Sequence, residues 1–161
     1  MTVLKFATHL WFDDQAEDAA RFYTSLFEDS RIDRVTPAPA GIPGGVQEGA
    51  PFIVDLTLMG QNYIFLNGGP EFPFDAQVSL YVLCDGQPEV DRYWDALLAD
   101  GGAPQQCGWL SDRFGLSWQV IPVQLERLMA DPDPQVSRRV TDAMLKMVKI
   151  DVAELEAAAR G

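Results

Sequence analysis

The sequence has few of the residues on which most metal sites and disulfide scaffolds depend. Among 161 residues there are two cysteines and one histidine. Cys84 and Cys107 match no paired metal-ligand motif, and two cysteines are too few for a disulfide framework. We therefore expect both thiols to be reduced and at least partly buried, and the protein to be cytoplasmic.

Positive charge and long apolar runs are also scarce. Lys and Arg total 12 against 24 Asp and Glu, which gives a net charge of −12. Because phosphate groups are bound by clustered cations, this balance argues against nucleic acid and anionic membranes as partners. No apolar run approaches the roughly 20 residues that span a bilayer. The N-terminus has neither a basic region nor a small-residue cleavage site.

A glycine-rich turn after the first strand is missing as well. Doubly wound methyltransferases need such a turn, followed by a helix N-terminus, to seat their nucleotide. Here the first predicted strand, Val3–Phe12, runs directly into Asp13 and Asp14. The glycines of 41–45 lie in a proline-rich loop with no predicted helix after it. The sequence therefore argues against methyl transfer of that type.

What is present is a strand and helix pattern that occurs twice. The first half predicts a strand, a helix that Asp14 can cap, and three further strands, over Val3–Phe12, Ala16–Phe27, Arg31–Thr36, Phe52–Met59 and Tyr63–Asn67. The second half starts again with a strand over Val78–Cys84. A helix after Pro88 and a strand–turn–strand unit over Cys107–Pro122 follow.

The two halves also match residue by residue. Asp13–Glu17 resembles Asp85–Glu89, and at the same spacing Phe22 falls on Trp94 without a gap. Neither half can bury both faces of its own sheet, so we expect the halves to pack against one another. The uncovered apolar surface also predicts a homodimer.

We therefore predict a single α+β domain over residues 1–161. Module one covers about 1–70 and module two about 75–122, and each has the order strand, helix and three strands (βαβββ). Residues 123–161 predict a helical tail, with a short helix over Val123–Met129, an apolar stripe from Val136 to Val148, and a last helix capped by Asp151. This tail covers either the sheet or a partner subunit.

The repeat further predicts which side chains line a cavity. It pairs Ala7 with Ser79 and His9 with Tyr81. Residues two apart on a strand share a face, so these four are expected to face one interior space. His9 is the first candidate for proton transfer near neutral pH, and a pocket or core histidine without a catalytic role is the alternative.

Aromatic residues are the other candidates for a ligand site. Tyr81, Trp109 and Trp118 fit either the walls of an apolar cavity or the core of the sheet. For Trp118 we favour the core, because its neighbour Gln119 takes the opposite face. The acidic run from Asp13 to Asp18 is interpreted as helix capping, since negative charge is favourable at a helix N-terminus.

Five stretches are long enough to compare with known families: HLWFDDQAEDAARFYTSLF, FLNGGPEF, EVDRYW, CGWLSDRFGLSWQVIP and the DPDP…AMLKM…IDVAELEAA tail. Together they resemble the PhnB-like branch of the vicinal-oxygen-chelate superfamily, which includes glyoxalases and bleomycin-resistance proteins. This branch is often labelled 3-demethylubiquinone-9 3-methyltransferase. The resemblance implies the vicinal-oxygen-chelate fold, with paired βαβββ modules in an incomplete barrel around a cavity, and a homodimer.

The resemblance also carries four metal-ligand positions onto this chain. They fall near Ala7, with His9 two residues on, near Asn67, on Ser79 and on Gln119. Alanine has no ligand atom, and serine, asparagine and glutamine are neutral, whereas divalent ions favour imidazole and carboxylate. We therefore expect no catalytic metal and no cofactor.

Two classes of function stay open. The first is a protein that binds a small, partly aromatic molecule without a metal, in a cavity lined by His9, Asn67, Ser79, Tyr81, Trp109 and Gln119. The second is a lyase, isomerase or dioxygenase-like enzyme that uses His9 and Gln119 with a loosely held divalent metal. The sequence identifies neither the ligand nor a reaction.

Overall fold

A computed structural model describes residues 5–161 of the chain. Residue contacts divide the chain into two compact units, Met1–Pro73 (unit 1) and Phe74–Gly161 (unit 2). Unit 1 corresponds to module one, and unit 2 to module two with the tail. The packing of both modules into one domain stays a prediction. The start of the predicted strand Val3–Phe12 lies outside the described residues.

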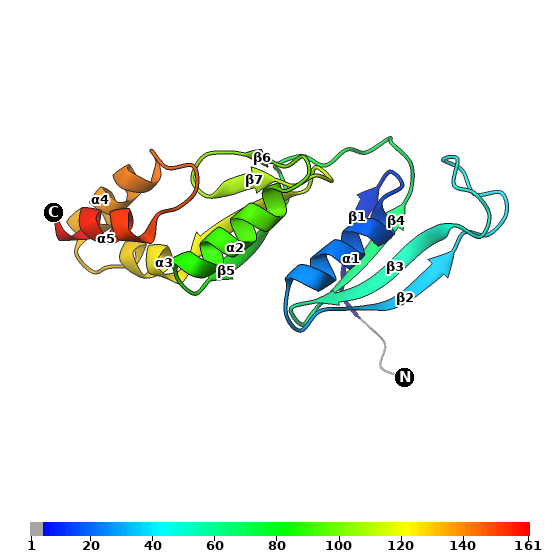
Figure 1. The fold of residues 1–161 in the computed structure, drawn as a ribbon, viewed down its shortest axis with the longest axis horizontal. Helices are drawn as coiled ribbons and strands as arrows, with labels where there is room; N and C mark the ends of the chain where they lie inside the picture. Colours follow the sequence, from blue (N-terminus) through cyan, green and yellow to red (C-terminus); the bar gives the residue numbers. More distant parts are fainter. Residues whose placement is uncertain (1–4) are drawn as a thin grey trace. The chain divides into compact units, whose positions relative to one another are not determined.

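Unit 1 is a four-stranded sheet with one helix on it (Figure 1). Its elements are β1 (Thr8–Phe12), α1 (Ala16–Leu26), β2 (Arg31–Pro37), β3 (Pro51–Leu58) and β4 (Gln61–Asn67). The strand order is β1-β4-β3-β2, with β1 parallel to β4 and the other pairs antiparallel. The order of strands and helix predicted for the first half is confirmed.

The helix α1 is held against one face of this sheet by burial of its alanines and Tyr23. Ala16, Ala19 and Ala20 are fully buried, and such small side chains let the helix approach the sheet closely. The Tyr23 ring stands edge-on to Phe65, with 6.0 Å between ring centroids. The apolar positions of the helix thus meet alternate, inward-facing positions of the strands.

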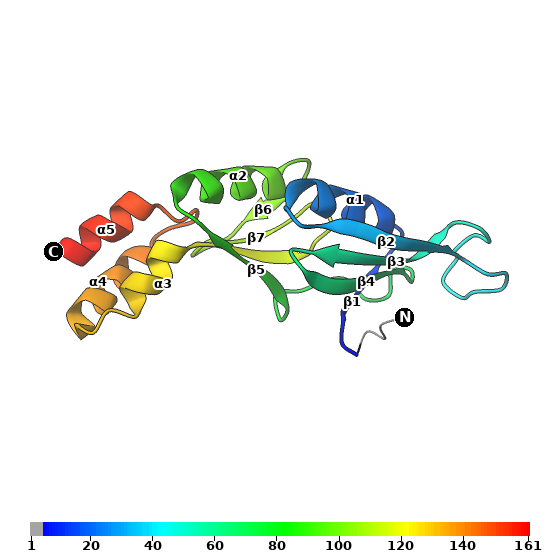
Figure 2. The same ribbon diagram turned by 90° about the horizontal axis from the view of Figure 1, so that it is seen from below.

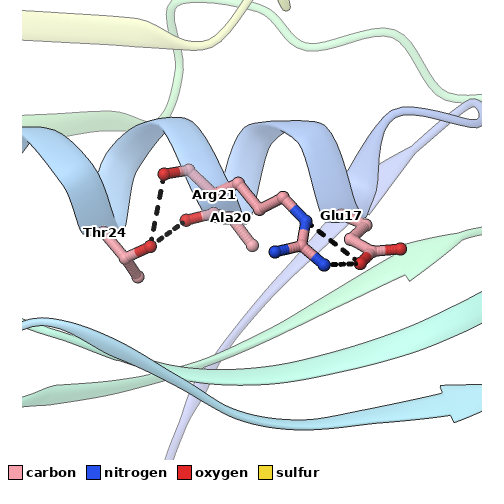
Figure 3. A network of polar contacts seen from close by, with 4 residues as sticks. All are labelled: Glu17, Ala20, Arg21 and Thr24. Atoms are coloured by element: carbon pink, nitrogen blue, oxygen red, sulfur yellow. Dashed lines mark hydrogen bonds and ion pairs between the residues drawn. The ribbon is translucent and has the colours of Figure 1, made fainter.

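Beside this buried face, α1 carries local polar contacts (Figure 3). Arg21 donates hydrogen bonds to the Glu17 carboxylate one turn earlier, and the Thr24 hydroxyl donates to the Ala20 carbonyl oxygen at 2.8 Å. An exposed ion pair at this spacing stabilises a helix by only about 0.3–0.5 kcal/mol. Burial against the sheet, rather than this ion pair, therefore positions the helix.

The start of α1 is held by a residue that is distant in the sequence. The helix is preceded by Gln15, which makes no side-chain cap, so the prediction that Asp14 caps the helix is wrong. Instead, the Ala16 N–H donates to Oδ1 of Asn67 at 2.7 Å, and Asn67 Nδ2 donates to the Pro51 carbonyl oxygen. The last residue of β4 therefore takes the role of a helix cap.

Unit 2 repeats the same arrangement. Its sheet and first helix are β5 (Ser79–Cys84), α2 (Gln87–Leu98), β6 (Ala103–Pro104), β7 (Trp109–Ser111) and β8 (Ser117–Pro122). The strand order is β5-β8-β7-β6, with β5 parallel to β8. Both units therefore have one βαβββ topology, and the α+β fold of paired modules is confirmed.

The core of unit 2 lies between this sheet and α2. Val90, Trp94 and Leu97 of the helix are buried, as are Val120 and Trp118 of the central strand. Trp118 is 2% exposed, which confirms its interpretation as a core residue.

Asp112 holds the turn between β7 and β8. Its side chain is 3% exposed and accepts hydrogen bonds from the backbone N–H groups of Phe114 and Leu116 and from the indole N–H of Trp118 at 2.8 Å. One buried carboxylate thus links the turn to the core.

The tail consists of three helices, α3 (Val123–Met129), α4 (Pro134–Met144) and α5 (Val152–Arg160), which gather at one end of unit 2 (Figure 2). Asp151 caps α5 as predicted, because it accepts the Glu154 N–H at 2.9 Å. Met147, which was predicted on the helical stripe, is buried but follows the end of α4. Among residues 5–161, no helix is both long and apolar enough to cross a membrane.

We expect Asp112→Ala to destabilise unit 2 by about 2–4 kcal/mol, because it leaves buried donors, including the Trp118 indole N–H, without this acceptor. Chemical denaturation followed by tryptophan fluorescence measures the change. Glu156→Ala on the exposed side of α5 is the control, with an expected change within about 0.5 kcal/mol. Equal stability of the two variants would contradict this role of Asp112.

Candidate functional site

Four of the predicted site residues lie together on the sheet of unit 2, on the face opposite α2. Tyr81 of β5 pairs with Gln119 of β8, and Gln119 pairs with Trp109 of β7, so the three form one row across the sheet. Ser79 lies two residues before Tyr81 on β5, and the Gln119 side-chain amide donates a hydrogen bond to the Ser79 hydroxyl at 3.0 Å. Their shared face follows from the period of two along a strand.

The row borders a cleft of about 220 Å³ that has two walls. One wall is the sheet with its β6–β7 loop, and the other is the helical tail. The sheet and loop supply Tyr81, Cys107, Trp109, Gln119 and Ile121, and the tail supplies Leu125, Glu126, Met129 and Met144.

A hydrogen bond joins the two walls. The Tyr81 hydroxyl donates to Oε1 of Glu126 at 2.8 Å. Partial burial and the negative charge of this carboxylate raise the pKa of Tyr81 well above its ordinary value, so the phenol is neutral throughout the physiological range. Tyr81 therefore acts in the cleft as a neutral aromatic group whose proton is directed at Glu126.

The two cysteines lie in different surroundings, and burial keeps Cys84 from acting as an activated nucleophile. Cys84 is buried under α2, and burial, the largest cause, raises the pKa of its thiol to about 12. Cys107 lines the cleft with a backbone φ of 59° and is partly buried. The cleft thus offers aromatic, thioether, amide and carboxylate groups.

His9 lies in unit 1, on the face of the sheet that α1 leaves uncovered. It is exposed, and along the sheet it neighbours Ile64 of β4, which in turn neighbours Asp55 of β3. Asp55 forms an ion pair with Arg34 at 2.8 Å. Within unit 1, His9 therefore stands on an open face beside apolar side chains, and Ala7 precedes its strand.

Asn67 lies on the other face of the same sheet, so its predicted place beside His9 is wrong. It pairs with Phe12, whereas His9 pairs with Ile64. In the repeat, Ile64 takes the place of Gln119, because Ile64 pairs with His9 as Gln119 pairs with Tyr81. Asn67 is three residues further on, and an odd shift turns a side chain to the opposite face. Its role in ligand binding stays a prediction.

A wider cleft in unit 1 is lined by the acidic start of α1. It has a volume of about 530 Å³ and lies between Asp13, Asp14, Glu17 and Asp18 and the loop at Gly44–Gln47. Glu17 and Asp18 occupy the first turn of the helix, where the helix dipole favours negative charge. Across residues 5–161, no group of three or more His, Cys, Asp or Glu side chains is arranged to hold a metal ion.

Sequence reasoning missed the tail side of the cleft. Glu126, Met129 and Met144 were assigned to helices that cover either the sheet or a partner subunit. The signal was weak, because their place beside Tyr81 depends on how the tail folds back after Pro122.

The comparisons with known proteins agree with this architecture. A family model described as 3-demethylubiquinone-9 3-methyltransferase matches residues 4–121. The chain belongs to this PhnB-like family of the vicinal-oxygen-chelate superfamily. The tail helices α3 to α5 lie beyond the end of the family match.

Two solved structures show the same fold. A Bacillus cereus PhnB protein, described as a putative 3-demethylubiquinone-9 3-methyltransferase, is 33% identical, with a TM-score of 0.66, and the match covers 74% of this chain and 100% of that chain. Protein PA1353 from Pseudomonas aeruginosa is 18% identical, with a TM-score of 0.60, and the match covers 74% and 98%. No curated protein matches the chain.

Proposed function

We propose that this PhnB-like protein binds a small, partly aromatic molecule in the cleft of unit 2 without a catalytic metal. The row of Tyr81, Gln119 and Trp109 is the observation that carries the proposal. Aromatic faces give apolar contact area, and a single amide between them gives orientation, which is the usual composition of a small-molecule site.

The lining favours binding over metal chemistry. Gln119 uses one of its two amide N–H groups on Ser79, so its carbonyl oxygen and its second N–H remain for a ligand. Glutamine and serine bring no charge to a divalent ion. The predicted alternative, a metal-dependent enzyme that uses His9 and Gln119, therefore has less support.

We do not propose methyltransferase activity, although the family is described by that name. That chemistry needs a seat for the methyl donor, and in doubly wound enzymes the seat is a glycine-rich turn before a helix. In unit 1, the turn between β1 and α1 consists of Asp13, Asp14 and Gln15, with Asn67 at the helix start.

The binding proposal is tested by a thermal-shift screen of small aromatic compounds, since a ligand that binds the folded state raises the melting temperature. For any compound found, we expect Trp109→Ala to weaken binding by about tenfold or more, because the ring supplies a wall of the cleft. Phe6→Ala, which removes an exposed aromatic ring of unit 1 outside the cleft, is the control and is expected to bind as the native chain does.

A set of compounds whose affinities are unchanged by Trp109→Ala would show that this cleft is not the site. Isothermal titration supplies the affinities, and circular dichroism of each variant establishes that it is folded.

We further propose a homodimer. In unit 1, Trp11, Ile64 and Leu66 lie on the face opposite α1, where each is only partly buried. Apolar side chains on a sheet face favour burial against a second copy. We expect sedimentation at micromolar concentration to give a dimer that Ile64→Arg dissociates and that Glu28→Arg, an exposed control, leaves intact. A monomeric native chain would contradict the proposal.

A further inference from the structure

The two walls of the cleft differ in origin. The sheet wall belongs to the part of the chain that the family model matches, and that match ends at Ile121. The tail wall begins two residues later with α3, at Val123, and supplies Glu126, Met129 and Met144. The cleft is therefore lined both by residues inside the family match and by residues of the tail that lie outside it.

The tail wall is fixed against the sheet by backbone hydrogen bonds and by a core of its own. The N–H groups of Cys107 and Gly108 donate to the carbonyl oxygens of Met147 and Val148, at 2.9 and 2.7 Å. Leu125, Val140, Met147, Ile150 and Leu155 are buried together with Ile121, the last matched residue. Both ends of the tail wall are thus held in place before any ligand binds.

A second connection ties the tail to α2. The Gln87 side chain donates to the Ile150 carbonyl oxygen at 3.1 Å and accepts the Val152 N–H at 2.8 Å. Lys149 forms an ion pair with Asp91 at 2.9 Å. These contacts fix the segment between α4 and α5.

The charge of the cleft comes from the tail. Glu126 is the charged side chain among its described lining residues, which include no lysine or arginine. The Tyr81 hydroxyl donates to one oxygen of the Glu126 carboxylate. A carboxylate accepts hydrogen bonds at both oxygens, so a ligand can donate to Glu126 as well. The aromatic faces of Tyr81 and Trp109 also attract positive charge, as does the net charge of −12.

We propose that the tail makes this site selective for small, single-ring molecules that carry a protonated amine. This rests on the proposed function. The ring packs against Trp109 and the methionine thioethers, and the ammonium donates to Glu126 and to the Gln119 carbonyl oxygen. A volume of about 220 Å³ lies below the roughly 300–1,000 Å³ of drug-sized pockets, which favours one ring.

Three probes that share one ring test the charge preference on the full chain: benzylamine, benzyl alcohol and benzoate. Their affinities are measured by ligand-observed NMR titration at low and high salt. We expect benzylamine to bind about two- to fivefold more tightly than benzyl alcohol, because an exposed carboxylate is screened by water. Benzoate should bind most weakly, and added salt should reduce the benzylamine preference.

The variant Glu126→Gln removes the charge and keeps an acceptor for Tyr81, so it is expected to fold and to lose most of the preference for benzylamine over benzyl alcohol. Glu156→Gln, which changes the net charge equally but lies on the exposed side of α5, should keep the preference. Loss of preference in both variants would assign the effect to overall charge and overturn the proposed role of Glu126.

Unchanged benzylamine affinity in Glu126→Gln, or binding of none of the three probes at low millimolar concentration, would also overturn it. The proposed function is judged separately by the Trp109→Ala comparison. Compounds from the screen whose affinity falls in Trp109→Ala but is unchanged in Glu126→Gln would support the binding function and contradict this inference.

Discussion

The parallel pairing of β5 with β8 is the constraint on which the site depends. Because the register sets Tyr81 beside Gln119, it sends Val82 and Val120 under α2 and leaves the row of Tyr81, Gln119 and Trp109 on the opposite face. A shift by one residue would bury the polar row and expose the core. Core packing and the position of the site are therefore consequences of one register.

Two features maintain that register. The buried apolar side chains of α2 pack only against the apolar face of the sheet. Asp112 holds the β7–β8 turn by accepting hydrogen bonds from backbone N–H groups and from the Trp118 indole. The tail then covers part of the face that α2 leaves open, and it brings Glu126 against Tyr81. Unit 1 has the same topology without such a tail, and among its described residues the side chains of His9 and Trp11 lie on its uncovered face.

Much of this fold was predictable because local patterns determine it. The helical periodicity around Tyr23 and Trp94, the alternation along β4 and β8, and the repeat between the halves gave the βαβββ order and the core position of Trp118. The two-residue strand β6 is too short to give a pattern. Asn67 was predicted on the wrong face because the resemblance assigned a family ligand position to it. The strand register places Ile64, three residues earlier, beside His9.

The site was predicted only on its sheet side. Ser79 and Tyr81 were predicted from the repeat and from strand periodicity, Gln119 from the family resemblance, and Trp109 as one of the aromatic candidates. Glu126 and Met144 come near them through the return of the tail, which no local pattern specifies. Likewise, the cap on α1 comes from Asn67 rather than from Asp14, because a long-range contact replaces the local one.

The central claim is that a ligand binds in unit 2 between the aromatic row and the tail. A crystal structure of the chain with a compound that raises its melting temperature tests this most directly. The account predicts the compound in contact with Trp109 and Gln119 on one side and with Met129 or Met144 on the other. A compound bound instead in the acidic cleft of unit 1, with the unit 2 cleft empty, would contradict it.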